Sequence, residues 1–458
     1  MNITLWKIGL ALVVSVLVLF LGVAVAIAPI YIAVFSVIPI FLVIAFTQFR
    51  IGVLIVLFFA TGIIPSQLTP KFSLGGGDVQ VEELLFGILL IVCLIRMALN
   101  KNHFINNSVY YPIYFFFLLS ILATLIGIGN QNKYNFILID LRTVFYWLYA
   151  FLLAISIQNE KELNSAIKIL IILSTILSTV VILQSLLGIQ LLSRGRLTGL
   201  HTLDKTVGVS RSQFGGLISL AVFAFILTLT RVARKEMPTL IGLLCSSILG
   251  LSIVLSFGRG IWAAAFLSVL TASIWLGFRS FVRIWAVLMT LGITSTLIAL
   301  IVTPEYVDAA VSRIFSVRQE VSEGRSYEWR KLENAHAIQT IKEHPVFGVG
   351  IGGEYKRPER NYKFVEMGEQ ETFMMHNSWL WLMFKFGIIG IVFPIWLTIA
   401  VFYKARKLNT SLSIASASAL LTPIVAGGTQ MEWATRFGIL CIATMVGFLI
   451  ANSNVAQK

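Results

Sequence analysis

Long apolar runs, repeated along nearly the whole chain, are the feature that most limits what this sequence can fold into. Each extends for roughly 17 to 25 residues, enough for a helix to cross a hydrocarbon core of about 30 Å. Hydrophobic residues make up 57% of the 458-residue chain and charged residues only 12%. Because backbone groups in lipid must be paired within the spanning structure, uninterrupted runs of this length favour helices over a strand barrel. The sequence therefore predicts an all-α, polytopic transmembrane bundle.

The runs predict a bundle of about 12 to 14 spans. The candidates are residues 8–27, 28–47, 50–66, 82–98, 110–127, 138–157, 165–187, 212–230, 238–256, 260–278, 284–303, 386–403, 411–430 and 435–452. The first run is interpreted as a span and not as a removable signal peptide, because no small-residue cleavage site leads into a soluble domain.

Basic residues fall on alternate connections between these spans. The positive-inside rule then places both ends of the chain in the cytoplasm and the polar segment Pro304–Met375 outside. Three regions are expected: an N-terminal transmembrane bundle over 1–303, a mainly helical extracytoplasmic loop subdomain over 304–385 ending in an interfacial helix, and C-terminal transmembrane helices over 386–458.

Two features of the composition exclude other classes of protein. Cys93, Cys245 and Cys441 all lie inside apolar runs, so they are expected to be packing residues, with neither a disulfide framework nor a metal site. The formal net charge of +14 comes from basic residues scattered between spans. That dispersion fits a role in setting topology and argues against nucleic acid as a partner.

Several basic residues lie on connections that the topology places outside, against the positive-inside rule. The segment 193–212 carries Arg194, Arg196, Lys205 and Arg211 against a single carboxylate, and Arg259 lies on a short turn between two spans. A guanidinium near the hydrocarbon boundary is costly unless it is paired. A polyanionic ligand would supply the partner, and arginine binds phosphate oxygens in bidentate fashion. The alternative is pairing with lipid phosphates or with loop carboxylates.

His376 begins the return from the polar segment to the membrane. An imidazole accepts or gives a proton near neutral pH, so this position favours chemistry at the membrane surface. The alternative is a histidine hydrogen-bonded locally at a helix N-terminus. Asn377 either orients His376 or caps the next helix, and capping is the commoner use. His336 and His344 are interpreted as structural.

The polar segment also contains a predicted helix. Its expected apolar stripe, which would lie on the bundle, repeats every third residue: Trp329, Leu332, Ala335, Ile338 and Ile341. Pro345 disfavours helix at His344 and ends the pattern. The glycines of 348–353 are interpreted as a flexible turn and not as a phosphate cradle, because the Lys-Ser/Thr of a nucleotide loop is missing.

Together these motifs resemble the O-antigen ligase and O-antigen polymerase superfamily of bacterial membrane glycosyltransferases. In chain order they are Arg-x-x-Gly at Arg196–Gly199, Ser-x-x-Arg-Gly at Ser256–Gly260, Gly-Arg-x-x-x-Trp at Gly324–Trp329, His-Pro-x-x-Gly-x-Gly at His344–Gly350, and His-Asn-x-x-Leu with Gly-x-x-Gly at His376–Gly390. The likeness covers 190–390, under half of the chain.

The resemblance implies an enzyme of the inner membrane that transfers a glycan from a polyprenyl diphosphate, such as undecaprenyl diphosphate, to a glycan, lipid or protein acceptor on the outer face. It implies no cofactor, neither metal nor nucleotide sugar, and places the protein in polysaccharide or lipopolysaccharide biosynthesis. His376 is then the expected base, with Arg211 and Arg259 on the leaving diphosphate. Further substrate-binding candidates are Arg194, Arg196, Arg325 and Asn377.

Two alternatives remain open on sequence grounds. A secondary transporter of a small anion such as bicarbonate is the rival from another class, although the carboxylates near the membrane all fit outer span ends. Within the enzyme class, ligase and polymerase share the donor and differ in the acceptor, and nothing in the motifs separates them.

Overall fold

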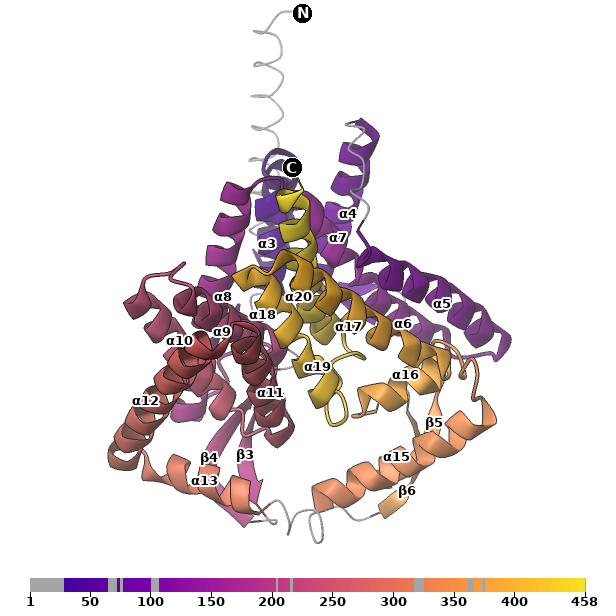
Figure 1. Cartoon of the computed structure of the whole chain (residues 1–458). Coiled ribbons are helices and arrows are strands. Elements are labelled where there is room, and N and C mark those ends of the chain that lie inside the picture. Colours follow the sequence, from indigo (N-terminus) through magenta and orange to yellow (C-terminus); the bar gives the residue numbers. More distant parts are fainter. Residues whose placement is uncertain are drawn as a thin grey trace, which may run out of the picture. The chain divides into compact units, whose positions relative to one another are not determined.

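Helices dominate the protein, as the sequence predicted. The structure, a computed structural model, describes residues 29–64, 72–74, 77–99, 107–202, 205–214, 217–316, 325–360, 366–372 and 375–457. Strands in these ranges form only three two-stranded antiparallel hairpins (Figure 1). The chain divides into two compact units, Met1–Asn102 and His103–Lys458, and each is described by itself. The predicted all-α, polytopic fold is confirmed.

The first unit contains a small group of apolar helices. Its described elements are α2 (Pro29–Thr47), α3 (Phe49–Ala60), β1 (Phe72–Leu74), β2 (Gly77–Val79) and α4 (Val81–Leu99). The three helices pack on one another. They coincide with three predicted spans, whereas the predicted span 8–27 lies outside the described residues.

The second unit contains the remaining spans and the long polar segment. Its first half consists of α5 (Tyr110–Gly129), α6 (Tyr134–Phe145), α7 (Leu148–Ser156), α8 (Glu160–Leu187), β3 (Arg196–Thr202), β4 (Lys205–Gln213), α9 (Ile218–Ala233), α10 (Thr239–Val254), α11 (Arg259–Trp275) and α12 (Phe278–Val302). Its second half consists of α13 (Pro304–Phe315), α15 (Arg325–Glu343), β5 (Tyr355–Arg360), β6 (Glu366–Thr372), α16 (Ser378–Phe386), α17 (Ile389–Leu408), α18 (Ser411–Ala419), α19 (Leu421–Ala426) and α20 (Arg436–Ala456).

Six helices in the described ranges are long and apolar enough to cross a membrane. They are Tyr110–Gly129, Tyr134–Ser156, Glu160–Leu187, Phe278–Val302, Ile389–Leu408 and Arg436–Ala456. Shorter apolar helices lie at Ile38–Thr47, Phe49–Ala60, Ile218–Ala233, Thr239–Val254, Arg259–Trp275 and Ser411–Ala426. In α12 only Ile284 is buried. Such an exposed apolar surface is the kind that contacts a membrane.

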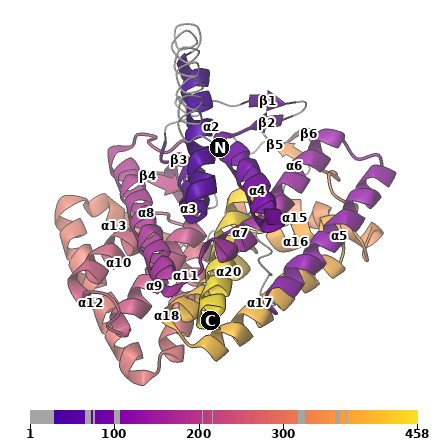
Figure 2. The ribbon, with the colours of Figure 1, turned by 90° about the horizontal axis from the view of Figure 1, so that it is seen from above.

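Helix α20 forms the centre of the second unit. It packs against α7, α9, α17 and α18, which surround it when the molecule is seen from above (Figure 2). Its residues are buried almost without interruption from Gly438 to Asn454. The aromatic rings of Trp147, Phe393 and Trp433 meet just before α20 begins, with Trp147 stacked on Trp433 at a centroid distance of 6.0 Å. A rigid core therefore lies directly behind the connection between α19 and α20.

The glycine-rich turn of 348–353 is packed against α5 and α16 and is not an open loop. The N–H of Val349 donates to Phe384 in α16 over 2.8 Å, and that of Ile351 donates to Ala123 in α5 over 2.9 Å. Gly348 adopts a φ of +68°, and a Cβ there would lie 2.5 Å from the carbonyl oxygen of Phe384. Only glycine combines this conformation with so close an approach.

A buried ion pair holds the same turn in place. Lys385 Nζ lies 2.8 Å from Asp140 Oδ2, and the two side chains are 0% and 5% exposed. The ammonium also donates to the carbonyl oxygen of Gly353, and the N–H of Gly352 donates to Asp140, each over 2.8 Å. The glycine-rich turn is thus joined to α6 and α16 immediately before β5.

Candidate active site

The imidazole predicted to accept a proton is paired with a carboxylate. His376 Nδ1 lies 2.9 Å from Glu333 Oε2, and the backbone N–H of His376 donates to the same oxygen over 3.3 Å. The other oxygen of Glu333 accepts the hydroxyl of Tyr355 over 3.4 Å. An ionised carboxylate only accepts hydrogen bonds, so this contact places the proton on Nδ1 and leaves the Nε2 lone pair for another partner.

The segment around His376 is held to the connection between α19 and α20. Ser378 Oγ donates to the carbonyl oxygen of Gln430 over 2.6 Å, and the N–H of Ser378 donates to Gly427 over 2.8 Å. Asn377 is the N-cap of α16, its Oδ1 accepting the N–H groups of Trp379 and Leu380 over 3.0 and 3.2 Å. Asn377, predicted as a substrate ligand or a cap, therefore serves as a cap in this structure and fixes where α16 begins.

Three arginines meet at the turn of Ser256–Gly260. Arg211 Nε donates to the carbonyl oxygen of Ser256 over 2.8 Å, and Arg313 Nε donates to that of Phe257 over 3.4 Å. The Arg259 guanidinium instead contacts the end of α13. Its Nε donates to the carbonyl oxygen of Arg313 over 2.7 Å and its Nη2 to Ser316 Oγ over 2.8 Å. Arg211 and Arg259, predicted together from sequence, are thus brought to one place, and Arg313 joins them.

A hydrophobic cluster underneath holds this basic turn in position. Leu200 and Val209 from the β3–β4 hairpin, Leu255 and Phe257 from the turn, and Ala309 from α13 are all buried in it. Phe257 is fully buried although its φ is +49°, a left-handed conformation that costs an aromatic residue roughly 1–2 kcal/mol. Packing therefore overrides local preference at this turn.

Gln184 at the end of α8 fixes the hairpin that carries Arg211. Its side chain is completely buried. It donates to Ser212 Oγ over 2.7 Å and accepts the N–H groups of Leu191 and Leu192, each over 2.9 Å. Strands β3 and β4 pair antiparallel, with Thr198 opposite Arg211. The segment 193–212, interpreted from sequence as a loop, is a hairpin because this pairing and the buried amide satisfy its backbone.

The α19–α20 connection links the basic turn with His376. Gly260 stands so close to Thr429 that a Cβ at residue 260 would lie 2.7 Å from Thr429 Oγ1. The next residue, Gln430, accepts the hydrogen bond from Ser378, two residues after His376. Two neighbouring residues of one connection therefore touch the arginine turn and the histidine segment.

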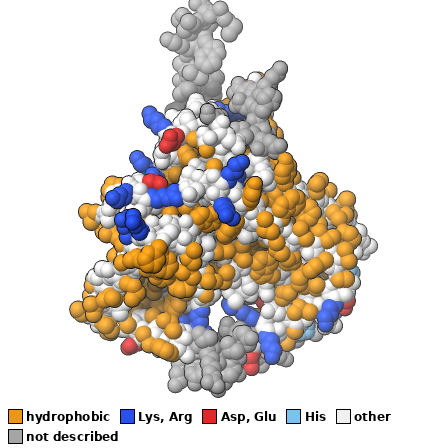
Figure 3. Space-filling model, viewed as in Figure 1, with side chains coloured by type: hydrophobic (Ala, Val, Ile, Leu, Met, Phe, Trp, Pro, Cys, Tyr) orange, Lys and Arg blue, Asp and Glu red, His pale blue; other side chains and the backbone are white. Residues whose placement is uncertain are grey.

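The surface view shows an opening on the face drawn in Figure 3. Lys and Arg side chains stand on both sides of it, near the lower edge of the face shown in Figure 3. In the same view of the ribbon, α13 lies on one side and α15 on the other, below α19 (Figure 1). The opening is therefore bordered by positive charge.

A buried carboxyl lies on the same connection. Glu432 is 3% exposed, and its Oε2 accepts the hydroxyl of Ser219 over 3.0 Å. Burial raises the pKa of Glu432 to about 7, and the hydrogen bond from Ser219 opposes that rise. This group consequently changes charge within the physiological pH range.

The other predicted residues are placed as follows. The guanidinium of Arg194 lies over the ring of Phe437, 4.2 Å from its centroid, at the start of α20. Arg436 lies over the same ring at 4.8 Å. Arg196 begins β3 and Arg325 begins α15, but their side chains lie outside the described part of the structure.

Sequence reasoning missed Glu333 and Arg313. Glu333 lies on the predicted loop helix but was not part of the expected apolar stripe. The stripe is wrong: Ala335 and Ile338 are exposed, whereas Glu333 and Ala337 are buried. Steps of three residues advance 300° and drift around a helix of 3.6 residues per turn, so the stripe could not remain on one face. Arg313 gave no signal beyond its charge.

Residues 241–395 match the family model described as O-antigen ligase. This part of the chain is similar to the O-antigen ligase family. The predicted resemblance is thereby confirmed. Among the curated proteins no significant match is found.

The matched residues contain most of the site described above. Arg259, Arg313, Glu333 and His376 all lie within the matched residues, whereas Arg211 precedes them. The protein is accordingly a multi-pass membrane protein in which residues 241–395 are similar to the O-antigen ligase family.

Proposed function

We propose that this protein transfers a glycan from a polyprenyl diphosphate to an acceptor hydroxyl on the outer face of the bacterial inner membrane. The observation that carries the proposal is the meeting of Arg211, Arg259 and Arg313 at one turn. That turn and Ser378, two residues after His376 of the His376–Glu333 pair, contact adjacent residues of the same connection. Such an enzyme acts as a ligase or a polymerase of polysaccharide or lipopolysaccharide synthesis.

The arginines suit the leaving group. When the bond between the anomeric carbon and the diphosphate oxygen breaks, the electron pair stays on that oxygen and negative charge develops there. Fixed guanidinium groups stabilise such charge without reorganising during the reaction. The Nε contacts with backbone carbonyls orient Arg211 and Arg259. A guanidinium carries five donors in a planar fork, a geometry that matches phosphate oxygens.

The histidine suits the attacking group. In the proposed reaction the acceptor hydroxyl oxygen bonds to the anomeric carbon, and its proton passes to His376 Nε2. Glu333 holds Nδ1–H during this transfer and stabilises the imidazolium that forms. The His376 side chain is 48% exposed, so an acceptor can approach it from outside the bundle.

The proposed membrane arrangement follows from the charges on the connections. Both termini lie in the cytoplasm, and α13, α15, the β5–β6 hairpin and α16 lie outside. Membrane lipids surround the spans, and the polyprenyl chain of the donor stays in the bilayer. Arg194, Arg196 and Arg325 remain proposed ligands for more distant parts of the donor.

Transfer in purified form tests this function. Liposomes containing the protein receive polyprenyl-diphosphate-linked glycan extracted from cells that lack it, together with the acceptor fraction of the same cells. We expect transfer by the wild type, and almost none by His376→Ala or Arg259→Ala. His344→Ala and Arg279→Ala, which alter exposed residues elsewhere, serve as matched controls. Accumulation of labelled bicarbonate in the liposomes without any transfer would instead favour the transporter.

A further inference from the structure

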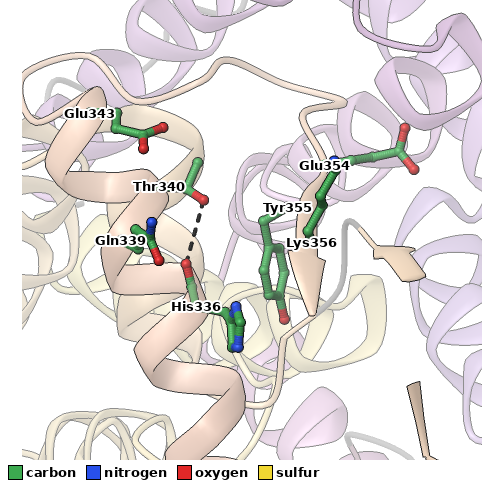
Figure 4. Close-up of a pocket in the computed structure, with 7 residues that line it drawn as sticks. All are labelled: His336, Gln339, Thr340, Glu343, Glu354, Tyr355 and Lys356. Carbon is green, nitrogen blue, oxygen red and sulfur yellow. Dashed lines mark hydrogen bonds between the residues drawn. The ribbon is translucent and has the colours of Figure 1, made fainter. Parts of the chain in front are cut away.

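A polar pocket lies between α15 and β5, outside the residues assigned to the reaction so far. It encloses about 430 Å³ and is lined by His336, Gln339, Thr340, Glu343, Glu354, Tyr355 and Lys356. Figure 4 shows His336 projecting from α15 toward Tyr355 on β5, while Glu354 points away from α15. Glu354 forms an ion pair with Lys133 at 2.9 Å. The chain therefore keeps one wall of the pocket fixed.

Tyr355 connects this pocket with the proposed base. Tyr355 is one of the lining residues although it is almost fully buried, and its hydroxyl donates to Glu333, the partner of His376. On α15, Glu333 is followed on the same face by His336 and Thr340 of the pocket, because residues three and four apart are neighbours on a helix. The pocket thus begins one helical turn, about 5.4 Å, beyond the carboxylate that holds the imidazole.

The lining groups suit a ligand rich in hydroxyl groups. Amide, hydroxyl, imidazole, carboxylate and ammonium groups all occur, so both donors and acceptors are available. A lipid chain would find almost no aliphatic wall here, and a diphosphate would meet the carboxylate of Glu343. A saccharide has neither a long aliphatic chain nor the negative charge of a diphosphate, so it suits this lining.

We propose that this pocket binds a sugar residue of the acceptor, adjacent to the sugar whose hydroxyl attacks. The proposal rests on the proposed transfer reaction, in which His376 receives the proton of the acceptor. The arginine turn binds the diphosphate of the donor, and the pocket lies beside the base instead. The spacing of one helical turn between Glu333 and the pocket is comparable to one pyranose unit. Acceptors of at least two sugars are therefore expected to bind better than single sugars.

Protection from chemical labelling tests binding without requiring transfer. In a Cys245→Ser background, whose remaining cysteines are buried, Gln339→Cys is labelled with a membrane-impermeant maleimide. The probe is the free oligosaccharide released by mild acid from the acceptor fraction. We expect it to slow labelling at least tenfold in this variant and not in Lys331→Cys, which lies about two helical turns before Gln339 on α15 and does not line the pocket. Equal labelling rates with and without saccharide, or equal protection in both variants, would overturn the proposal.

Kinetics separate the acceptor pocket from the donor site. Gln339→Ala and Thr340→Val each remove a polar group, so we expect the KM for the acceptor to rise about tenfold while kcat and the KM for the donor stay near wild type. Lys331→Ala is the matched control. A rise only in the KM for the donor, or no change, would contradict the proposal. Protection without transfer would support saccharide binding in the pocket and refute the proposed reaction. Transfer without protection and without a change in KM would support the reaction and refute the pocket.

Discussion

His376 Nδ1 and Glu333 Oε2 lie 2.9 Å apart although one side chain is half-exposed and the other fully buried. Glu333 also accepts the backbone N–H of His376 and the hydroxyl of Tyr355, so the carboxylate is surrounded by donors. Burying a carboxylate is costly unless such donors are present. The pair therefore fixes both the position and the tautomer of an imidazole that faces outward.

Glu333→Gln should lower kcat roughly 100-fold with little change in KM, because an amide does not hold Nδ1–H as a carboxylate does and leaves the imidazolium unstabilised. Steady-state transfer rates over a range of acceptor concentrations measure this. Tyr355→Phe, which removes only the long hydrogen bond, should cost a few fold by comparison.

The control for this prediction is Glu328→Gln, an exposed carboxylate on the same helix. A purely structural role of Glu333 would lower the melting temperature and reduce the amount of active protein without changing kcat per folded molecule. Wild-type kcat in folded Glu333→Gln would refute the positioning role.

Arg259→Lys should lose roughly 100-fold in transfer, nearly as much as Arg259→Ala, because one ammonium cannot reproduce the contacts that Nε and Nη2 make with Arg313 and Ser316. Arg313→Ala should also reduce transfer, by about tenfold, although sequence analysis did not single it out. Transfer from the lipid-linked donor at saturating acceptor measures both effects. Arg279→Lys is the control. Full activity of Arg259→Lys would show that the positive charge alone is sufficient at this position and that the guanidinium geometry is not needed.

The apolar runs predicted most helices well, because a span needs a fixed length of apolar residues whatever it packs against. The predicted span 110–127 is α5, and 435–452 is α20, each within a few residues. The predicted span 411–430 is instead two short helices, α18 and α19, and the second ends at Ala426 with Gly427 as its C-cap. The span predicted from 212 begins at Ile218, because Arg211–Gln213 belong to β4.

The site was predictable where chemistry and position coincide in the sequence, and not where it depends on packing. Arg259 and His376 stand out because charged and titratable residues at span ends are costly. The pairing of Arg211 with the Ser256 carbonyl depends on the β3–β4 hairpin, which has no periodicity that reveals its partner strand. Glu333 becomes significant only once α15 lies beside His376. Contacts between residues far apart in the chain are thus what the sequence could not supply.

Glu432 should make stability depend on pH. Burial raises its pKa from 4.5 to about 7, so the folded protein keeps the proton where the unfolded chain has lost it. The resulting stabilisation is complete below pH 4.5 and is lost as the pH rises through 7. A shift of this size corresponds to about 3 kcal/mol. Glu432→Gln cannot ionise and should remove this dependence.

Melting temperatures of the detergent-solubilised protein between pH 5 and about pH 8 test this. Glu432→Gln should match the wild type at the acidic end and be more stable at the alkaline end. Glu305→Gln, an exposed carboxylate, is the control and should follow the wild type throughout. Parallel curves for wild type and Glu432→Gln would contradict the prediction.

The ion pair between Lys385 and Asp140 should matter far more for stability than a second pair beside it. Asp140→Asn leaves a fully buried ammonium without its counter-ion, which typically costs about 3–5 kcal/mol. The pair of Lys133 with Glu354 joins the same region, but Lys133 is 59% exposed, so Lys133→Met should cost less than about 1 kcal/mol. The double variant Asp140→Leu with Lys385→Met should recover part of the loss, because it removes both charges together. Thermal unfolding in detergent distinguishes these cases, and equal melting temperatures for Asp140→Asn and Lys133→Met would show that the buried pair does not hold the glycine turn.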